Sequence, residues 1–150
     1  MAPSLKYSLH GQSKYVLGKP ILITFDLENS SSTDLRVLTW YTPLEGIKGK
    51  IFEVTCDGEA IPYEGRMVKR GNPGQEDYVL IHAGGSAHAE FDLSQAYSLR
   101  ECKECRVNFK GRIHDVFVDG EHPSRAADQQ ASVEVPGEPL SFRIEKGPDK

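Results

Sequence analysis

Long apolar runs and an excess of positive charge are both missing from this 150-residue sequence. No stretch approaches the ~18 consecutive apolar residues that a membrane-spanning helix needs, so we expect no membrane contact. Lys and Arg number 18 against 22 Asp and Glu, giving a formal net charge of −4. Nucleic-acid-binding domains are usually strongly basic, so we expect no nucleic-acid partner either. The two kinds of charge are mixed along the chain, as on a solvated surface.

Motifs of the common enzyme classes are also missing. The sequence contains no HExxH, no glycine-rich phosphate loop and no GxSxG. We therefore expect no catalytic residues, no cofactor and no bound metal. A weaker enzyme hypothesis rests on His114, Asp115 and Asp119, although neighbouring residues of a strand point to opposite faces. The histidines are scattered one to a segment, at His10, His82, His88, His114 and His122.

Cysteine is scarce: Cys56, Cys102 and Cys105 allow one disulfide and leave one thiol over. The CKEC string that holds Cys102 and Cys105 is a single CxxC, whereas a zinc site normally needs a second ligand pair. A redox CxxC is expected beside a βαβ pattern, which this chain lacks. We predict that Cys102 and Cys105 flank a turn at a strand entry. They are a candidate disulfide, bonded or free according to the compartment. Cys56 has the parity of an inward-facing core residue.

The N-terminal stretch MAPSLKYSLHGQSKY lacks the apolar core of a secretory signal. We expect a cytoplasmic protein if the chain is complete, and a secreted or periplasmic one if a signal peptide has been removed. The length suits one domain, and we find no internal repeat or linker. The predicted boundaries are one domain over residues 1–146 and a frayed tail over residues 147–150.

Short segments with alternating apolar and polar residues recur along the chain. They occupy residues 5–9, 21–27, 35–40, 52–56, 87–93, 107–109 and 140–144, and turn signals such as CDGEA and HAGGS separate them. Because each strand has one apolar face, two antiparallel sheets must pack face to face. The sequence predicts an all-β, immunoglobulin-like antiparallel sandwich of about seven to nine strands. At most one short helical turn is expected, in DLSQAYSL over residues 92–99.

Several unusual strings follow one another in a defined order. LRVLTWYTPLEGIKGKIFEV at residues 35–54 precedes DGEAIPYEGRMVKRGNPGQEDYVLIHAGGS at residues 57–86 and AEFDLSQAYSL at residues 89–99. Together with YVLGKPILITFDLENSS and VNFKGRI, this order resembles the N-terminal pro-domain of deuterolysin-like, aspzincin metallopeptidases, including the peptidyl-Lys-specific bacterial members. The resemblance covers most of residues 5–118. In that family, a segment of about this size precedes the zinc protease.

The chain also departs from that family. The protease motifs HExxH and GTxxD have no counterpart here, so no zinc ligand or catalytic residue can be carried over from the family. RECKEC stands where a plain glycine-containing turn is more usual. The segment HDVFVDGEHPSRAADQQASVEV, residues 114–135, has no counterpart either. The resemblance therefore implies a relative of the pro-domain used without its protease.

A pro-domain of this kind implies a non-catalytic protein that binds a zinc metallopeptidase and inhibits or regulates it. The candidate contact residues are Tyr41, Thr42, Pro43, Leu44 and Glu45 in YTPLE, and Tyr63, Arg66, Lys69 and Arg70 in YEGRMVKR. Both segments combine an aromatic residue with charge, as interface hot spots often do. Lys69 and Arg70 would suit a cleft that prefers a basic residue. Alternatively, they guard an edge strand against aggregation.

A second hypothesis is a stand-alone immunoglobulin-like binding or structural module that contacts another protein or a carbohydrate and has no link to proteolysis. Trp40 carries a related ambiguity. It ends an apolar run, which favours a core position, but a loop follows at once, which would suit an exposed anchor at the rim. The oligomeric state is left open by the sequence.

Overall fold

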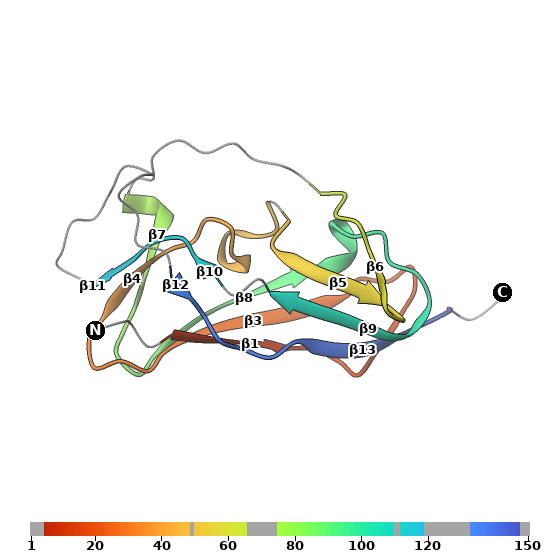
Figure 1. Ribbon diagram of the computed structural model, residues 1–150, viewed down its shortest axis with the longest axis horizontal. Helices are drawn as coiled ribbons and strands as arrows, with labels where there is room; N and C mark the ends of the chain where they lie inside the picture. The colour runs from red at the N-terminus through yellow and green to blue at the C-terminus, as the bar shows by residue number, and fades with distance from the viewer. Residues whose placement is uncertain (1–4, 49, 66–74, 110–111, 119–132, 148–150) are drawn as a thin grey trace.

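The computed structural model describes residues 5–48, 50–65, 75–109, 112–118 and 133–147. Over these residues the chain is all-β and forms the immunoglobulin-like sandwich that the alternating sequence predicts (Figure 1). Phe25 and Leu27 are buried while Asp26 and Glu28 between and beside them point outward, which is the period of two that a half-buried strand requires. No helix in the described part of the chain is long and apolar enough to cross a membrane.

Two sheets make the body of the sandwich. The first has the order β1-β3-β8, with strands at Leu5–His10, Leu22–Asn29 and Ser86–Asp92. The second has the order β2-β13-β9-β5-β6, with strands at Lys14–Val16, Leu140–Glu145, Cys102–Phe109, Phe52–Cys56 and Glu59–Ala60. Neighbouring strands in both sheets are antiparallel except β2 and β13, which run parallel with Tyr15 opposite Ile144.

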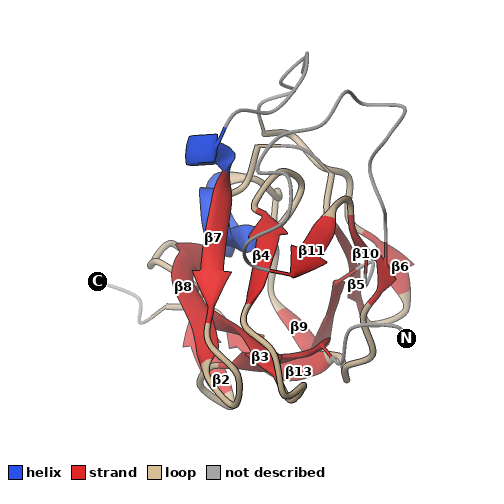
Figure 2. Ribbon diagram, turned by 90° about the vertical axis from the view of Figure 1, so that its left-hand side faces the viewer, coloured by secondary structure: helices blue, strands red, loops and turns tan. Residues whose placement is uncertain are grey.

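Smaller elements extend one end of the sandwich (Figure 2). A sheet of order β11-β4-β7 uses Val116–Val118, Leu35–Leu38 and Tyr78–Ile81, and β10 at Arg112–Ile113 pairs with β12 at Val133–Glu134. The thirteen strands described exceed the predicted number because several have only two or three residues, too few to show an alternation.

Three 3-10 turns occur among the described residues, where the sequence predicts at most one. They are η1 at Pro43–Glu45, η2 at Gln75–Asp77 and η3 at Leu93–Gln95. The turn expected in residues 92–99 is η3, and its cap is Asp92, whose side chain accepts the Ser94 N–H at 3.0 Å. Each turn has three residues, too short for an apolar period to reveal it.

The interior has a large aromatic core and a smaller one beside it. Phe25, Phe52 and Phe109 lie at the centre of the large core, with ring centroids 5.1 to 5.9 Å apart for the pairs that contain Phe109. The smaller core consists of Leu38, Trp40, Tyr78 and Phe117. Trp40 is 8% exposed, so it occupies the core position rather than the exposed rim.

Candidate functional site

The segment Tyr41–Glu45 forms a turn that its own polar groups stabilise. The Thr42 hydroxyl accepts the Leu44 N–H at 3.1 Å, and a Glu45 carboxylate oxygen accepts the Tyr41 N–H at 2.7 Å. Thr42 and Pro43 are buried. These two predicted contact residues therefore support the turn and cannot face a partner, which corrects the prediction for them. Tyr41, Leu44 and Glu45 are partly exposed and remain candidates.

Tyr41 packs against His114, with ring centroids 4.8 Å apart. Burial of the His114 imidazole, and then the positive charge of Arg112, lowers the pKa of His114. The neighbouring Asp115 is fully buried, and its carboxyl group accepts the Tyr78 hydroxyl at 2.6 Å. His114 and Asp115 thus have separate surroundings, as expected for neighbours in extended chain. Asp119, the third residue of the enzyme hypothesis, lies outside the described residues.

The second predicted segment is described only as far as Gly65. Tyr63 forms an isolated bridge with Tyr97, and the two rings meet edge to face at 5.4 Å. A Cβ at Gly65 would lie 2.6 Å from the Tyr63 hydroxyl oxygen, so glycine permits this close approach. The predicted contact residues Arg66, Lys69 and Arg70 lie outside the described residues, and so does most of the predicted edge strand.

The described ends of both predicted segments open into one pocket of about 680 Å³. Gly46 and Ile47 follow η1, while Glu64 and Gly65 follow Tyr63. The rest of the lining comes from the start of β3, the end of β8 and the end of η3: Leu22, Glu90, Phe91, Asp92, Gln95 and Ala96. Leu22 is 45% exposed. A lining that combines apolar residues with the carboxylates of Glu64 and Glu90 suits a side chain with an aliphatic stem and a positive charge.

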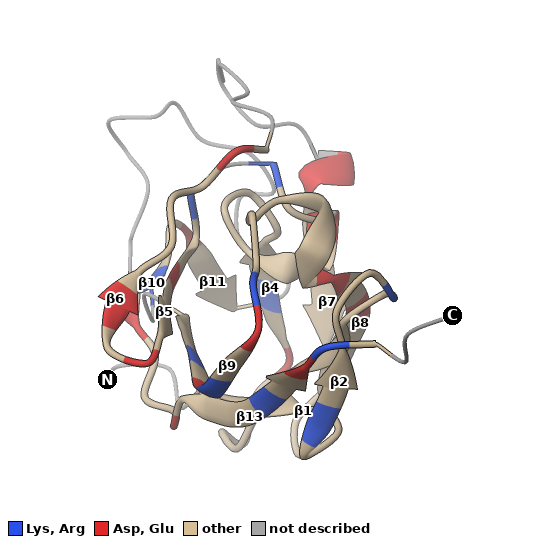
Figure 3. Cartoon of the chain, turned by 90° about the vertical axis from the view of Figure 1, so that its right-hand side faces the viewer, with Lys and Arg blue, Asp and Glu red and all other residues tan. Residues whose placement is uncertain are grey.

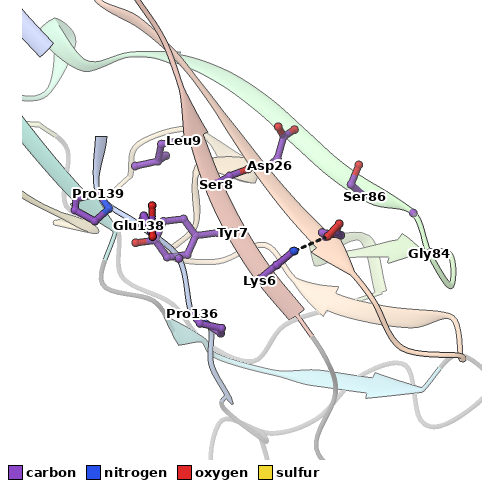
Figure 4. Close-up of a pocket in the computed structure, with 13 residues that line it drawn as sticks. Lys6, Tyr7, Ser8, Leu9, Asp26, Gly84, Ser86, Pro136, Glu138 and Pro139 are labelled. Atoms are coloured by element: carbon purple, nitrogen blue, oxygen red, sulfur yellow. Dashed lines mark ion pairs between the residues drawn. The ribbon is translucent and has the colours of Figure 1, made fainter. Parts of the chain in front are cut away.

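A larger cavity of about 920 Å³ lies elsewhere, between β1, the Gly84–Ser86 turn and residues 136–139 (Figure 4). Lys6 and Glu28, opposite each other on β1 and β3, form an ion pair of 3.3 Å in its lining. β1 is an edge strand of the first sheet, and the N–H of Tyr7 in this strand donates to the Pro136 carbonyl at 3.0 Å. The cavity therefore lies along the edge of the first sheet. None of the predicted contact residues that the structure describes lines it.

Charged residues are interspersed on the strands. In Figure 3, basic and acidic positions lie close together on β9 and β13. On the outer face of the first sheet, Asp26 lies between two imidazoles, 3.0 Å from His10 Nε2 and 3.8 Å from His88 Nδ1. Within the described ranges, no group of three or more His, Cys, Asp or Glu residues is arranged to hold a metal ion.

The cysteines lie in strands of the second sheet. Cys102 and Cys105 both belong to β9, which corrects the prediction that they flank a turn. Cys56 is fully buried at the end of β5 and is a core residue, as predicted. All three thiols are free in this structure.

No protein-family model matches the chain. An extracellular protease of Aeromonas hydrophila is 30% identical over 79 residues, which make up 53% of this chain and 22% of that protein. The chain therefore covers only a minor part of its relative's length. Among solved structures, the CARDB domain of a Pyrococcus furiosus protein, in complex with di-metal ions, is 10% identical with a TM-score of 0.43; the alignment covers 97% of this chain and 96% of that one.

The fold and the sequence comparison together define a β-sandwich module. Part of the module has weak similarity to an extracellular protease. The pocket beside Tyr63 and η1 was not predictable from the sequence, because its lining comes from four separate stretches of the chain. The exposed Leu22, whose parity in the alternating segment is outward, is the one sequence signal that points to it.

Proposed function

We propose that this β-sandwich is a non-catalytic module that binds a zinc endopeptidase and inhibits or regulates it. The observation that carries the proposal is the 30% identity over 79 residues to an extracellular protease. The order of the VLTWYTPLEG, IPYEGRMVKRG and DLSQAY strings, which resembles an aspzincin pro-domain, supports the more specific assignment to zinc endopeptidases.

The proposed contact surface is the rim formed by Tyr41, Leu44, Glu45 and Tyr63 together with the pocket beside them. Tyr41 and Tyr63 are partly exposed aromatic residues, the type that contributes most at protein interfaces. Each is already fixed, Tyr41 against His114 and Tyr63 against Tyr97. A rim that is ordered before binding loses little conformational entropy on contact, which favours a tight complex.

Charge would add specificity to this surface. Glu64 and Glu90 line the pocket, and Lys69 and Arg70 follow a few residues after Gly65 in the chain. A surface with both signs of charge fixes the orientation of a partner more than it raises affinity. The basic pair matches a cleft that accepts lysyl residues.

An inhibition assay tests the proposal. The purified protein is titrated into a lysine-specific aspzincin peptidase while the cleavage of a lysyl peptide is followed. We expect the rate to fall at nanomolar to micromolar protein. The double variant Lys69→Glu/Arg70→Glu is expected to weaken inhibition, and so is Leu44→Asp, which places a charge on the apolar part of the rim.

The control is Lys6→Glu, which reverses the charge of one basic residue at a distance from the proposed surface. Lys6 pairs with Glu28 near one end of β3, whereas Leu22 of the pocket begins the same strand at its other end. Its exposed ion pair contributes little to stability, so this variant should inhibit like the natural sequence. An undiminished cleavage rate at micromolar protein would contradict the proposal. Binding to a glycan array without inhibition would favour a stand-alone binding module instead.

A further inference from the structure

Three cysteines that are far apart in the sequence come together in the second sheet. Cys56 ends β5, and Cys102 and Cys105 lie in the adjacent β9. They are 0%, 4% and 0% exposed. Their thiols are close enough for each to affect the pKa of a neighbouring thiol. Burial raises the pKa of Cys102, and a hydrogen bond with the Cys56 thiol adds to the effect. Burial, followed by the nearby Cys56, raises the pKa of Cys105 to about 12, while a hydrogen bond with the Cys102 thiol acts in the opposite direction.

A β-bulge explains why Cys102 and Cys105 both face the interior. Residues three apart in a regular strand point to opposite faces. In β9, however, Cys105 pairs with Phe142 and Cys102 with Ile144, so two residues of β9 oppose a single residue of β13. The burial pattern confirms the shift, since the two residues between the cysteines are exposed.

Asp57 holds the bulge in place. One oxygen of its carboxylate accepts the N–H groups of Lys103 at 3.0 Å and Glu104 at 2.9 Å. The Asp57 N–H in turn donates to the Glu104 carbonyl at 2.9 Å. These bonds attach the bulged part of β9 to the residue that directly follows Cys56. They fix the position of the cysteines relative to one another.

Cys56 and Cys105 lie directly opposite each other in the antiparallel ladder. In an antiparallel ladder, hydrogen-bonded and non-hydrogen-bonded pairs alternate. The next pair along, Asp57 and Glu104, is joined by the bond from the Asp57 N–H to the Glu104 carbonyl, so Cys56 and Cys105 form a non-hydrogen-bonded pair. The Cα atoms of such pairs are about 4.5 Å apart, within the range of about 4.4–6.8 Å that disulfides require. Cys102 and Cys105 would be about 10 Å apart in a regular strand, and they lie in the same strand, not opposite each other in a ladder.

We propose that Cys56 and Cys105 are a cross-linking site that forms a disulfide between β5 and β9 when the chain folds in the presence of a disulfide oxidant such as oxidised glutathione. One cysteine thiolate attacks the oxidant and releases one glutathione thiol. The second cysteine then displaces the other glutathione and closes the S–S bond. Two electrons pass to the oxidant, and the two protons of the cysteines end on the two glutathione molecules released.

The proposal assigns separate roles to the three cysteines. Cys102 keeps its thiol, in the interior beside the bridge. Because the thiolate is the attacking species and buried thiols stay protonated, the finished reduced domain should react slowly with the oxidant. The bridge should therefore form while β5 and β9 are still accessible. This inference does not depend on the proposed function.

Peptide mapping tests the cross-link. The chain is unfolded, refolded with oxidised and reduced glutathione, alkylated and digested with trypsin without reduction. Trypsin cuts after Lys103, so Cys102 and Cys105 fall on different peptides. We expect mass spectrometry to find the Cys56 peptide joined to the Cys105 peptide, with Cys102 alkylated. The oxidised form should also have a higher urea midpoint than the reduced form.

Single variants sharpen the test. Cys102→Ser is expected to keep the Cys56–Cys105 peptide, whereas Cys56→Ser and Cys105→Ser should lose it. The wild-type map needs no variant, so a variant that fails to fold leaves the test intact. A main product that joins Cys102 to either partner would overturn the proposal. Three alkylated cysteines after oxidative refolding would overturn it as well. If the folded reduced protein oxidises as fast as the refolding chain, the argument from burial is wrong.

Discussion

The hydroxyl group of Tyr78 donates a hydrogen bond of 2.6 Å to Oδ2 of Asp115, and both residues are buried. Tyr78→Phe removes this bond and leaves a buried acceptor with one partner fewer. We expect a loss of about 1–3 kcal/mol in the free energy of unfolding, measured by urea denaturation. The control is Tyr7→Phe, because the Tyr7 hydroxyl makes only longer contacts of 3.2 and 3.4 Å. Equal losses for the two variants would contradict the special weight given to the Tyr78–Asp115 bond.

Gly137 lies directly against the ring of Tyr7. A Cβ at this position would be 2.3 Å from Tyr7 Cε2, far inside van der Waals contact. Gly137→Ala should therefore push the segment away from β1 and cost about 1–3 kcal/mol of stability, as overpacking usually does. Gly147→Ala is the matched control, since its nearest neighbour would be Val16 Cγ1 at an ordinary 3.4 Å. Thermal unfolding of the two variants side by side measures the difference.

Asn29 is a fully buried amide that joins three segments. Its Nδ2 donates to the carbonyls of Thr33 and Ile81, both at 2.9 Å, and its Oδ1 accepts the Ser31 N–H at 3.0 Å. Asn29→Ala is expected to cost about 1–3 kcal/mol, because buried acceptors lose their donor. Asn29→Asp should cost more at neutral pH, since a negative charge would face two carbonyl oxygens. That excess should shrink in acid, where a protonated carboxyl group can donate again. Urea midpoints at neutral and acidic pH check both statements.

His114 should make stability depend on pH. Burial, with a contribution from Arg112, lowers its pKa in the folded protein below the ordinary value of 6.5. Between the lowered folded pKa and 6.5, the unfolded chain binds more protons, so stability falls as the pH drops through this window. His114→Gln removes this contribution. The stability of the natural protein relative to the variant should decline as the pH falls below about 6.5. Urea midpoints over a pH series, with an NMR titration of the imidazole, measure it. A pH-independent difference would contradict the assignment.

The strands of the sandwich were predictable because their alternation is regular over several residues. Residues 22–29 and 86–92 show it clearly, since packing of one face dictates the residue type at every second position. The parity of Cys56 predicted its burial for the same reason. In β9, by contrast, the bulge breaks the period between Cys102 and Cys105, and the expected turn there is part of the strand.

The candidate site was less accessible to prediction. From the sequence, a polar residue such as Thr42 is expected at the surface. In the structure its hydroxyl caps a turn, and the residue is buried. The pocket depends on tertiary contacts that bring Leu22 close to Ile47 and Glu64, which no local pattern encodes. Local signals predict which residues form strands, but convergence of distant segments requires the three-dimensional structure.

The parallel pairing of β2 with β13 has a mechanical consequence. Lys14, Tyr15 and Val16 run in the same direction as Arg143, Ile144 and Glu145, so the start of β2 and the end of β13 lie at opposite ends of the pair. A force that pulls the ends apart would drag these two strands past each other. The bonds between them, including the 2.8 Å bond from the Leu17 N–H to the Glu145 carbonyl, would share that load at the same time and would not open one after another. This arrangement should resist stretching far better than a β-hairpin that is pulled at its open end, where the hydrogen bonds break one after another.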